Sequence, residues 1–310
     1  MALDLSIAAT VVAISIILSG ILIGFGRVIA SKRLEQFGTE ELIQSIINAA
    51  LVGAYAGIVA AATEISKEMV TDVTCTTGDS LENLGCVYSN LSDSIYNLLV
   101  YVVDLHHITS YYQSIVLEFP TLTIQPLSGL SSISSILSAQ IGTLQFLLMT
   151  AQLQVQLLSF FAPQLLTFFL PLGLIFRAFF STRKLGGFLI AFSIGIYLFY
   201  PSLIFIFPTP DLNETETFFQ NVTNQSLYAT QPIVILSNES YGIGGRIDSM
   251  SDADFSGDLT LSVQRLSDAT SSLTIFILVA PIFSLILTLI FIKEVTEIFG
   301  GEFFFAVGRL

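Results

Sequence analysis

The stretch ISSILSAQIGTLQFLLMTAQLQVQLLSFFAPQLLTFFLPLGLIF, residues 133–176, contains no charged side chain. A helix needs about 20 apolar residues to cross the hydrocarbon core of a bilayer. Comparable uncharged runs occupy 5–26 and 269–292, and shorter or weakly charged runs occupy three further places: 42–63, 95–117 and 185–207. The sequence therefore predicts an all-α integral membrane protein that crosses the bilayer several times.

The composition supports this class and argues against a soluble enzyme. Of the 310 residues, 53% are hydrophobic and only 11% are charged, whereas soluble domains average about 25% charged residues. The sequence contains no phosphate-binding P-loop, no G-x-S-x-G nucleophile motif and no HExxH zinc motif. We therefore predict no enzymatic activity, no catalytic residues, no metal site and no cofactor.

The basic residues predict the orientation of the chain, because Lys and Arg near the ends of spans mark the cytoplasmic side. Eight of the eleven basic residues directly follow apolar runs: Arg27, Lys32, Arg33, Arg177, Arg183, Lys184, Lys293 and Arg309. Arg177, Arg183 and Lys184 are expected to form a basic cytoplasmic turn. Most acidic residues fall in 67–94 and 208–270. The net charge of −13 is thus expected to mark an outer surface, not a site for a basic partner.

Seven spans agree with every basic cluster if the N-terminus is outside and the C-terminus is cytoplasmic. No basic segment precedes the first apolar run, so we expect that run to be a retained span and not a cleaved signal. The seven predicted spans are 5–30, 40–66, 95–117, 133–160, 162–181, 185–207 and 271–293, with Pro163 separating the fourth from the fifth. Five spans also agree, if 95–117 stays outside and 133–176 is one tilted or protruding helix.

This topology divides the chain into five regions of a multi-pass protein in the cell (plasma) membrane, with large extracellular loops. Residues 1–66 are expected to form an N-terminal transmembrane hairpin, and 67–94 an extracellular disulfide loop. Residues 95–207 contain the central transmembrane helices. Residues 208–270 form an extracellular acidic segment, and 271–310 form the last span with a cytoplasmic tail.

The two segments predicted to be outside, 67–94 and 208–270, carry the features of an oxidising, glycosylated compartment. Cys75 and Cys86 are the only cysteines, and two thiols in one small outer loop predict a disulfide. Five N-x-[ST] glycosylation motifs all lie in segments predicted to be outside: Asn90, Asn213, Asn221, Asn224 and Asn238. A loop rich in Ser, Thr and Asn also produces such motifs by composition alone, so occupancy stays open.

Two patterns predict contacts between helices. Small residues recur every fourth position in the first two spans, at Gly20 and Gly24 and at Gly53 and Gly57. Such faces let membrane helices approach closely, either within a hairpin or against a partner subunit. In the fourth span Ser138, Gln145, Gln152 and Gln156 follow one face. A polar stripe avoids lipid, so it predicts either hydrogen bonds between helices or the lining of a translocation path.

Three short motifs between 170 and 201 carry a resemblance. They are P-L-G-x-x-x-R at 171–177, T-R-x-x-G-G at 182–187 and G-x-Y-x-x-Y-P at 195–201. Together with the tail KEVTEIFGGE at 293–302, this pattern resembles the CedA-like polytopic membrane proteins of the crenarchaeal archaea. The chain departs from that group at Phe179-Phe180, where a proline-containing turn is expected.

The resemblance implies a membrane component of a DNA-import apparatus similar to the bacterial conjugation machinery. A separate conjugation-type ATPase, pilus subunits and membrane lipids would be its partners, and DNA the translocated substrate. The protein would act as a homo- or hetero-oligomer that forms or supports a translocation channel. Two alternatives stay open, a structural scaffold for a surface filament or secretion system and a solute channel or transporter.

Overall fold

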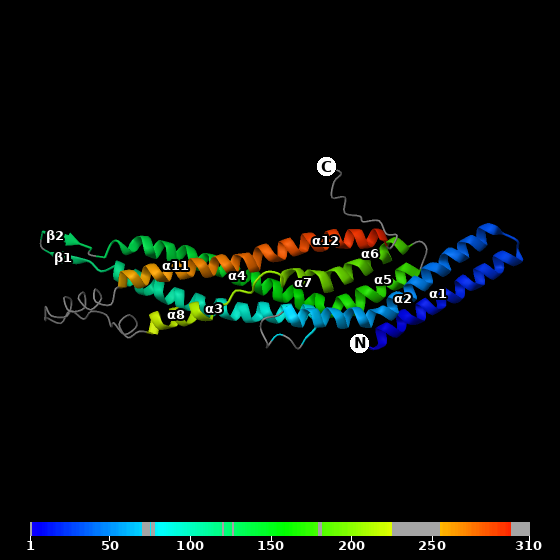
Figure 1. The fold of residues 1–310 in the computed structure, drawn as a ribbon. Helices are drawn as coiled ribbons and strands as arrows, with labels where there is room; N and C mark the ends of the chain where they lie inside the picture. Colours follow the sequence, from blue (N-terminus) through cyan, green and yellow to red (C-terminus); the bar gives the residue numbers. More distant parts are fainter. Residues whose placement is uncertain are drawn as a thin grey trace. The chain divides into compact units, whose positions relative to one another are not determined.

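The structure is a computed structural model that describes residues 2–69, 75, 78–119, 121–125, 127–178, 182–224 and 255–298. The chain forms two compact units, each assembled from separate stretches of sequence. Unit 1 comprises Met1–Val87, Val155–Pro208 and Ala280–Leu310, and unit 2 comprises Tyr88–Gln154 and Thr209–Val279. The described residues are almost entirely helical (Figure 1). The five regions expected from the sequence were consecutive, whereas these units are not.

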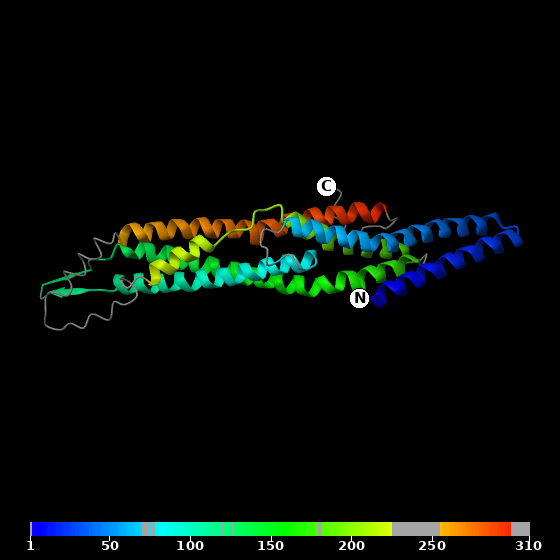
Figure 2. The same ribbon diagram turned by 60° about the horizontal axis from the view of Figure 1, so that its bottom comes forward.

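Unit 1 is a set of packed helical hairpins. Helices α1 (Ala2–Val28) and α2 (Lys32–Met69) form one antiparallel hairpin, which both views show (Figure 2). Helices α5 (Leu170–Ala178) and α6 (Arg183–Ile194) form a second hairpin, and α7 (Tyr200–Ile204) continues α6. Helix α12 (Ala280–Ile298) packs along α6 and α7. The turn between α1 and α2 places Ala30 at a φ of 55°.

Helix α12 shows that unit 1 suits an apolar surrounding. Its buried face contains the small polar residues Ser284, Thr288 and Thr296. Its exposed face carries large apolar side chains, among them Ile282, Phe283, Leu285, Ile286, Leu289 and Ile290. A helix in water would place these two kinds of residue the other way round. Membrane helices, in contrast, use small and polar residues for their mutual contacts.

Four helical segments of the described chain are long and apolar enough to cross a membrane. They are Ala9–Val28, Leu130–Arg177, Arg183–Ile204 and Leu259–Ile298. Four candidate spans thus support the predicted class, a helical membrane protein. At 1.5 Å per residue, the two longest segments, of 48 and 40 residues, extend about 72 and 60 Å. Both exceed the ~30 Å hydrocarbon core of a bilayer.

Pro163 does not separate two helices, so the prediction of separate spans at 133–160 and 162–181 is wrong. Helix α4 (Leu130–Gln164) contains Pro163 and runs through the π-helical turn η2 (Leu165–Phe169) into α5. A proline inside a helix removes only one main-chain donor. A broken helix in an apolar environment would leave more polar groups unpaired. The Thr167 hydroxyl donates to the Pro163 carbonyl, which adds a local contact at this point.

Three π-helical turns occur among the described helices, and each stands two residues before a proline. They are η2, η4 (Gly195–Phe199) and η5 (Ile275–Val279), which precede Pro171, Pro201 and Pro281. In η2 the Leu170 amide donates to the Leu165 carbonyl, one residue further back than in an α-helix. This wider turn accommodates a residue that cannot donate a hydrogen bond and whose ring crowds the preceding turn.

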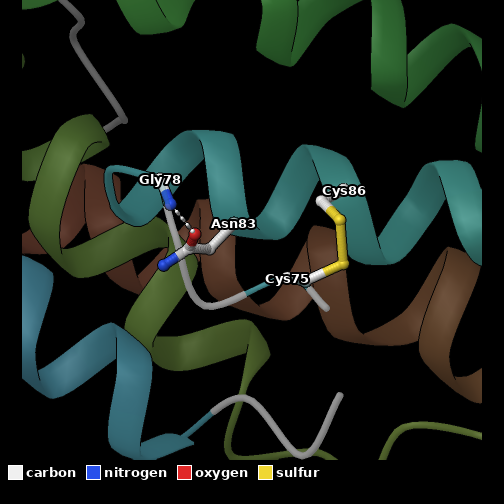
Figure 3. Close-up of a disulfide and its surroundings, with 4 residues drawn as sticks. All are labelled: Cys75, Gly78, Asn83 and Cys86. Atoms are coloured by element: carbon white, nitrogen blue, oxygen red, sulfur yellow. Dashed lines mark hydrogen bonds between the residues drawn. A yellow bond between two sulfur atoms is a disulfide. The ribbon is translucent and has the colours of Figure 1, made fainter. Parts of the chain in front are cut away.

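The disulfide region 67–94 was predicted to be a loop, and this is wrong for residues 80–94. Helix α3 (Ser80–Gln113) begins inside it, and Figure 3 shows how its first turn is fixed. The Glu82 carboxylate accepts a hydrogen bond from the Asp79 amide at 3.3 Å, and the Asn83 side chain accepts one from the Gly78 amide at 2.9 Å. Asp79 and Glu82 thus stand at the spacing of a capping box.

Unit 2 is built on heptad-spaced apolar residues. In α3 the buried residues follow steps of three and four, which is the pattern of helices packed side by side: Tyr88, Leu91, Ile95, Leu98, Val102, Leu105, Thr109 and Tyr112. Helix α4 contributes Leu137, Leu144, Leu147 and Ala151 to buried positions. The stretch 95–117, predicted as a possible span, is thus mostly the rest of α3. A short antiparallel hairpin of β1 (Leu117–Phe119) and β2 (Leu122–Ile124) begins at its last residue.

The remaining helices of unit 2 come from the segment 208–270. Helix α8 (Asn213–Asn224) contacts α3 through a hydrogen bond from Asn97 to Glu216 at 3.1 Å. Helix α11 (Phe255–Thr274) contacts α8, where the Arg265 guanidinium lies 4.9 Å from the centre of the Phe218 ring. The long acidic segment is therefore partly helical, and residues 225–254 lie outside the described residues.

Charge is divided unequally between the two units. Unit 2 contains twelve acidic and two basic residues, a formal charge of −10 out of the total of −13. Unit 1 contains nine of the eleven basic residues. All five glycosylation motifs fall in unit 2.

Candidate functional site

The α5–α6 hairpin of unit 1 closes around two glycines. A Cβ atom added at Gly186 would lie 2.3 Å from the Arg177 amide nitrogen and 2.6 Å from the Gly173 carbonyl oxygen. A Cβ atom added at Gly173 would lie 3.0 Å from the Ile190 amide nitrogen. Only glycine lets two helix backbones approach this closely. The two glycines therefore fix the crossing of the hairpin.

The turn of this hairpin makes a buried charged contact with α2. The Arg177 side chain, which is 3% exposed, donates from Nη2 to Oε1 of Gln44 at 3.2 Å. Arg183 forms an ion pair and hydrogen bond with Glu41, and their side chains are 18% and 12% exposed. Lys184 alone among the three predicted basic-turn residues is exposed. Helix α2 thus covers two of the three charges of the turn, and its predicted cytoplasmic location stays a prediction.

This contact fixes the register of α2 against the α5–α6 turn. Glu41 lies nine residues after Lys32, the first residue of α2. At 1.5 Å per residue, the turn between α1 and α2 therefore extends about 14 Å beyond the level of the ion pair. Arg27 pairs with Glu35 at 3.0 Å near that turn, where both side chains are substantially exposed.

The third motif of the 170–201 block packs against α12. A Cβ atom at Gly195 would lie 2.5 Å from Cγ1 of Ile292. The Phe199 ring stacks on Phe291 with 3.7 Å between the ring centres. Tyr197 is 2% exposed. All three motifs that carry the resemblance thus lie at buried helix contacts of unit 1.

The glycines predicted to join the first two helices meet no described atom within 4 Å of an added Cβ. This holds for Gly20, Gly24, Gly53 and Gly57. The α1–α2 contact uses Gly26 and Gly38 instead, where an added Cβ would lie 2.7 Å from the Glu35 amide nitrogen and 2.8 Å from Ile23. The predicted role of the first four glycines within the hairpin is wrong, and contact with a partner subunit stays a prediction for them.

The predicted polar stripe lies on the surface of α4. Ser138, Gln145, Gln152 and Gln156 are all exposed. Three of them directly follow the buried Leu137, Leu144 and Ala151, so the stripe lies about 100° around the helix from the buried face. The stripe therefore does not join helices within this chain, and a lining or intersubunit role stays a prediction. Sequence reasoning took its polarity as a sign of burial, because it assumed that this part of the helix is surrounded by lipid.

Gln154, which the sequence reasoning missed, is the glutamine of α4 that reaches another helix. Its Nε2 donates to the Ile277 carbonyl at 2.7 Å, and the Tyr88 hydroxyl donates to the Phe276 carbonyl at 3.4 Å. The Ile277 carbonyl lies four residues before Pro281, and the Phe276 carbonyl lies five residues before it. Pro281 has no N–H to donate to either. Gln154 follows Leu144, Leu147 and Ala151 in heptad spacing, and this spacing could have identified it.

Cys75 and Cys86 are disulfide-bonded with 5.5 Å between their Cα atoms, as predicted (Figure 3). The bond ties the segment before α3 to the second turn of that helix. Of the five glycosylation motifs, Asn90, Asn213 and Asn221 are exposed on helices, and Asn224 ends α8. Asn238 lies outside the described residues. Their occupancy stays a prediction.

The described residues include no group of three or more His, Cys, Asp and Glu side chains placed to hold a metal ion. His106 Nδ1 lies 3.5 Å from the Ser134 hydroxyl, and Ser110 lies 3.3 Å from the same hydroxyl. These contacts connect α3 with α4.

Comparison with known protein families, with curated proteins and with solved structures gives no match to the chain.

Proposed function

We propose that this protein is the polytopic membrane component of a DNA-transfer apparatus of the conjugation type, and that it forms or supports the translocation channel. The observation that carries the proposal is the 170–201 block. Five of its motif residues lie at buried contacts: Gly173, Arg177, Gly186, Gly195 and Tyr197. Motif residues that occupy buried helix contacts are a stronger basis for a family resemblance than a chance match in apolar sequence.

The proposal includes a topology. The apolar helices of unit 1 lie in the bilayer and unit 2 lies outside the cell, with the ends of α5 and α6 at Arg177 and Arg183 on the cytoplasmic side. The bilayer then surrounds about 20 residues before Arg177. The positive-inside rule supports this orientation, and so does the position of all five glycosylation motifs in unit 2. The five-span arrangement, with α2 added to the four apolar segments, suits these lengths better than seven spans.

Deleting the gene from its host is the direct test. Intercellular transfer of a chromosomal marker should be lost while growth stays normal. A plasmid copy should restore transfer, and an Arg183→Met copy should restore it only in part, because the buried Glu41 carboxylate then loses its ion-pair partner. A Lys184→Met copy, which changes an exposed neighbour, is the control. Normal transfer in the deletion strain would rule out the proposed function.

A scaffold for a surface filament is the second candidate, and unit 2 favours it. Its heptad-packed helices form a stiff body, which suits a structural support for a filament. Electron microscopy of the deletion strain separates the candidates. Loss of filaments, with DNA transfer intact, would favour the scaffold, whereas retained filaments with lost transfer would favour the channel component.

A further inference from the structure

Helix α4 carries an exposed face in unit 2 that combines large apolar and uncharged polar side chains. Met149 is 71% exposed, Leu153 is 58% exposed and Phe146 is 56% exposed. Gln145, Gln152 and Ser138 lie beside them and are exposed as well. We term these six residues the α4 face. Two sets within it, Gln145–Met149–Gln152 and Phe146–Met149–Leu153, follow three- and four-residue steps, as side chains do along a helix–helix contact.

The distribution of charge identifies what this face can meet. Helix α4 contains no charged residue over its whole length, Leu130–Gln164. The other long helices of unit 2 have exposed acidic residues, such as Asp93 and Asp104 on α3, Glu214 on α8 and Asp268 on α11. With a formal charge of −10, unit 2 repels a second unit 2 on approach by these helices. The α4 face is the side on which two copies can meet without bringing like charges together.

The membrane limits the geometry of such a contact. Copies of one protein in one bilayer share the same orientation, so identical helices from neighbouring copies run parallel around an axis normal to the membrane. Parallel helices meet through stripes with this spacing, and uncharged polar residues within the stripe fix the register. Exposed apolar side chains of this size, clustered on one helix face outside a membrane, mark interaction sites.

We propose that the α4 face packs against the α4 face of another copy of this chain and so holds the protein as a parallel, cyclic homo-oligomer. The proposal rests on the proposed topology, which places unit 2 in water. It assigns the predicted polar stripe to the contact between copies, with Gln145 and Gln152 beside Met149 at its centre.

Cysteine cross-linking in native membranes tests the proposal. The two native cysteines are joined to each other, so an introduced cysteine is the free thiol that an oxidant or a short bis-maleimide reaches. Met149→Cys should give a covalent species of twice the chain mass. Ser267→Cys, at an exposed position next to Asp268 on α11, should stay monomeric. Equal cross-linking of both variants, no dimer with Met149→Cys, or cross-linking only to a different protein would overturn the proposal.

A second measurement does not depend on cross-linking chemistry. The mass of the protein in detergent or nanodiscs should fall from an oligomer to a monomer with Met149→Glu, because each copy then brings a negative charge to the contact. Ser267→Glu should leave the mass unchanged. A monomeric native protein would also overturn the proposal. None of these readouts involves DNA transfer, so an oligomer through α4 together with normal transfer in the deletion strain would contradict the function alone.

Discussion

Individual glycines and arginines make the contacts that join the helices of unit 1. Gly186 brings the α6 backbone against Arg177, and the same arginine reaches Gln44 of α2. One residue change in this region therefore affects two helix contacts at once. The buried pair of Arg183 and Glu41 acts alongside it, because removing one partner would leave the other as an isolated charge in a covered site.

Replacing Gly186 by alanine should destabilise the protein strongly. The new methyl group would meet backbone atoms, which move far less easily than the end of a side chain, so we expect a loss of about 3 kcal/mol or more. Thermal unfolding of the purified protein in detergent measures this loss of stability.

Gly20→Ala is the matched control, because its Cβ meets no described atom within 4 Å. It should unfold at the same temperature as the parent or slightly higher, since alanine favours helix. Equal effects of the two substitutions would contradict the described α5–α6 crossing.

At this scale, sequence reasoning identified the cysteine pair but assigned the glycine contacts to the wrong positions. Spacing of four residues shows that Gly20 and Gly24 share a face. It does not show whether that face meets a neighbour. Gly26 and Gly38, which do make the contact, are single glycines without such a repeat. Which glycine is buried depends on where two helices cross, and this is a tertiary property.

Among the elements, the π turns before Pro171, Pro201 and Pro281 have the largest consequences. A π turn followed by a proline leaves main-chain carbonyls without donors. In η5 two of these, Phe276 and Ile277, receive hydrogen bonds from Tyr88 and Gln154. The turn is thus tied to α3 and α4 within unit 2 by polar contacts in an otherwise apolar core.

The substitutions Gln154→Leu and Pro281→Ala should be coupled. Gln154→Leu alone leaves the Ile277 carbonyl without its side-chain donor, which costs about 1–3 kcal/mol. In the Pro281→Ala background the cost should be smaller, because the introduced alanine supplies a main-chain amide that reaches the Ile277 carbonyl in an α-helix.

Unfolding of the parent, both single variants and the double variant gives the coupling free energy. Gln164→Leu, at an exposed glutamine of the same helix, should show no coupling with Pro281→Ala. Additive effects of Gln154→Leu and Pro281→Ala would show that Gln154 does not replace the hydrogen bond that Pro281 cannot give to the Ile277 carbonyl.

Helices were easier to predict from this sequence than their ends. The uncharged runs predicted helices α1, α6 and α12, because a helix surrounded by lipid needs a long apolar sequence. The predicted helix break at Pro163 was wrong, since a proline breaks helices in water more readily than in an apolar surrounding. The start of α3 was missed, although Asp79 and Glu82 stand at the spacing of a capping box. Polar composition in that region was taken for a loop.

On the scale of the whole molecule, charge separates the two units more clearly than any element does. The acidic residues divide equally, twelve to each unit, whereas nine of the eleven basic residues lie in unit 1 and all five glycosylation motifs lie in unit 2. Sequence reasoning predicted basic residues at the ends of apolar runs and glycosylation motifs in the segments between them, since both are visible in the sequence pattern alone. It could not predict that each unit combines distant stretches of the chain, because that follows from how α3, α4, α11 and α12 pack.

Labelling of introduced cysteines tests the proposed orientation. A membrane-impermeant maleimide added to intact cells should label Ser267→Cys in unit 2 and should not label Lys184→Cys in unit 1. Lys184→Cys should react after the cells are permeabilised, which shows that its thiol is accessible. The opposite pattern would invert the topology and with it the location of the acidic surface.

The pairing of each π turn with a proline also has an evolutionary consequence. A π turn is one residue inserted into an α-helix, so losing that residue restores regular winding and removes the need for the nearby proline. In an alignment of relatives, single-residue gaps should therefore fall inside 165–169, 195–199 or 275–279. Sequences with such a gap should also lack the proline that follows. Gaps within apolar helices would otherwise be taken for alignment errors, and here they would record the gain or loss of a turn.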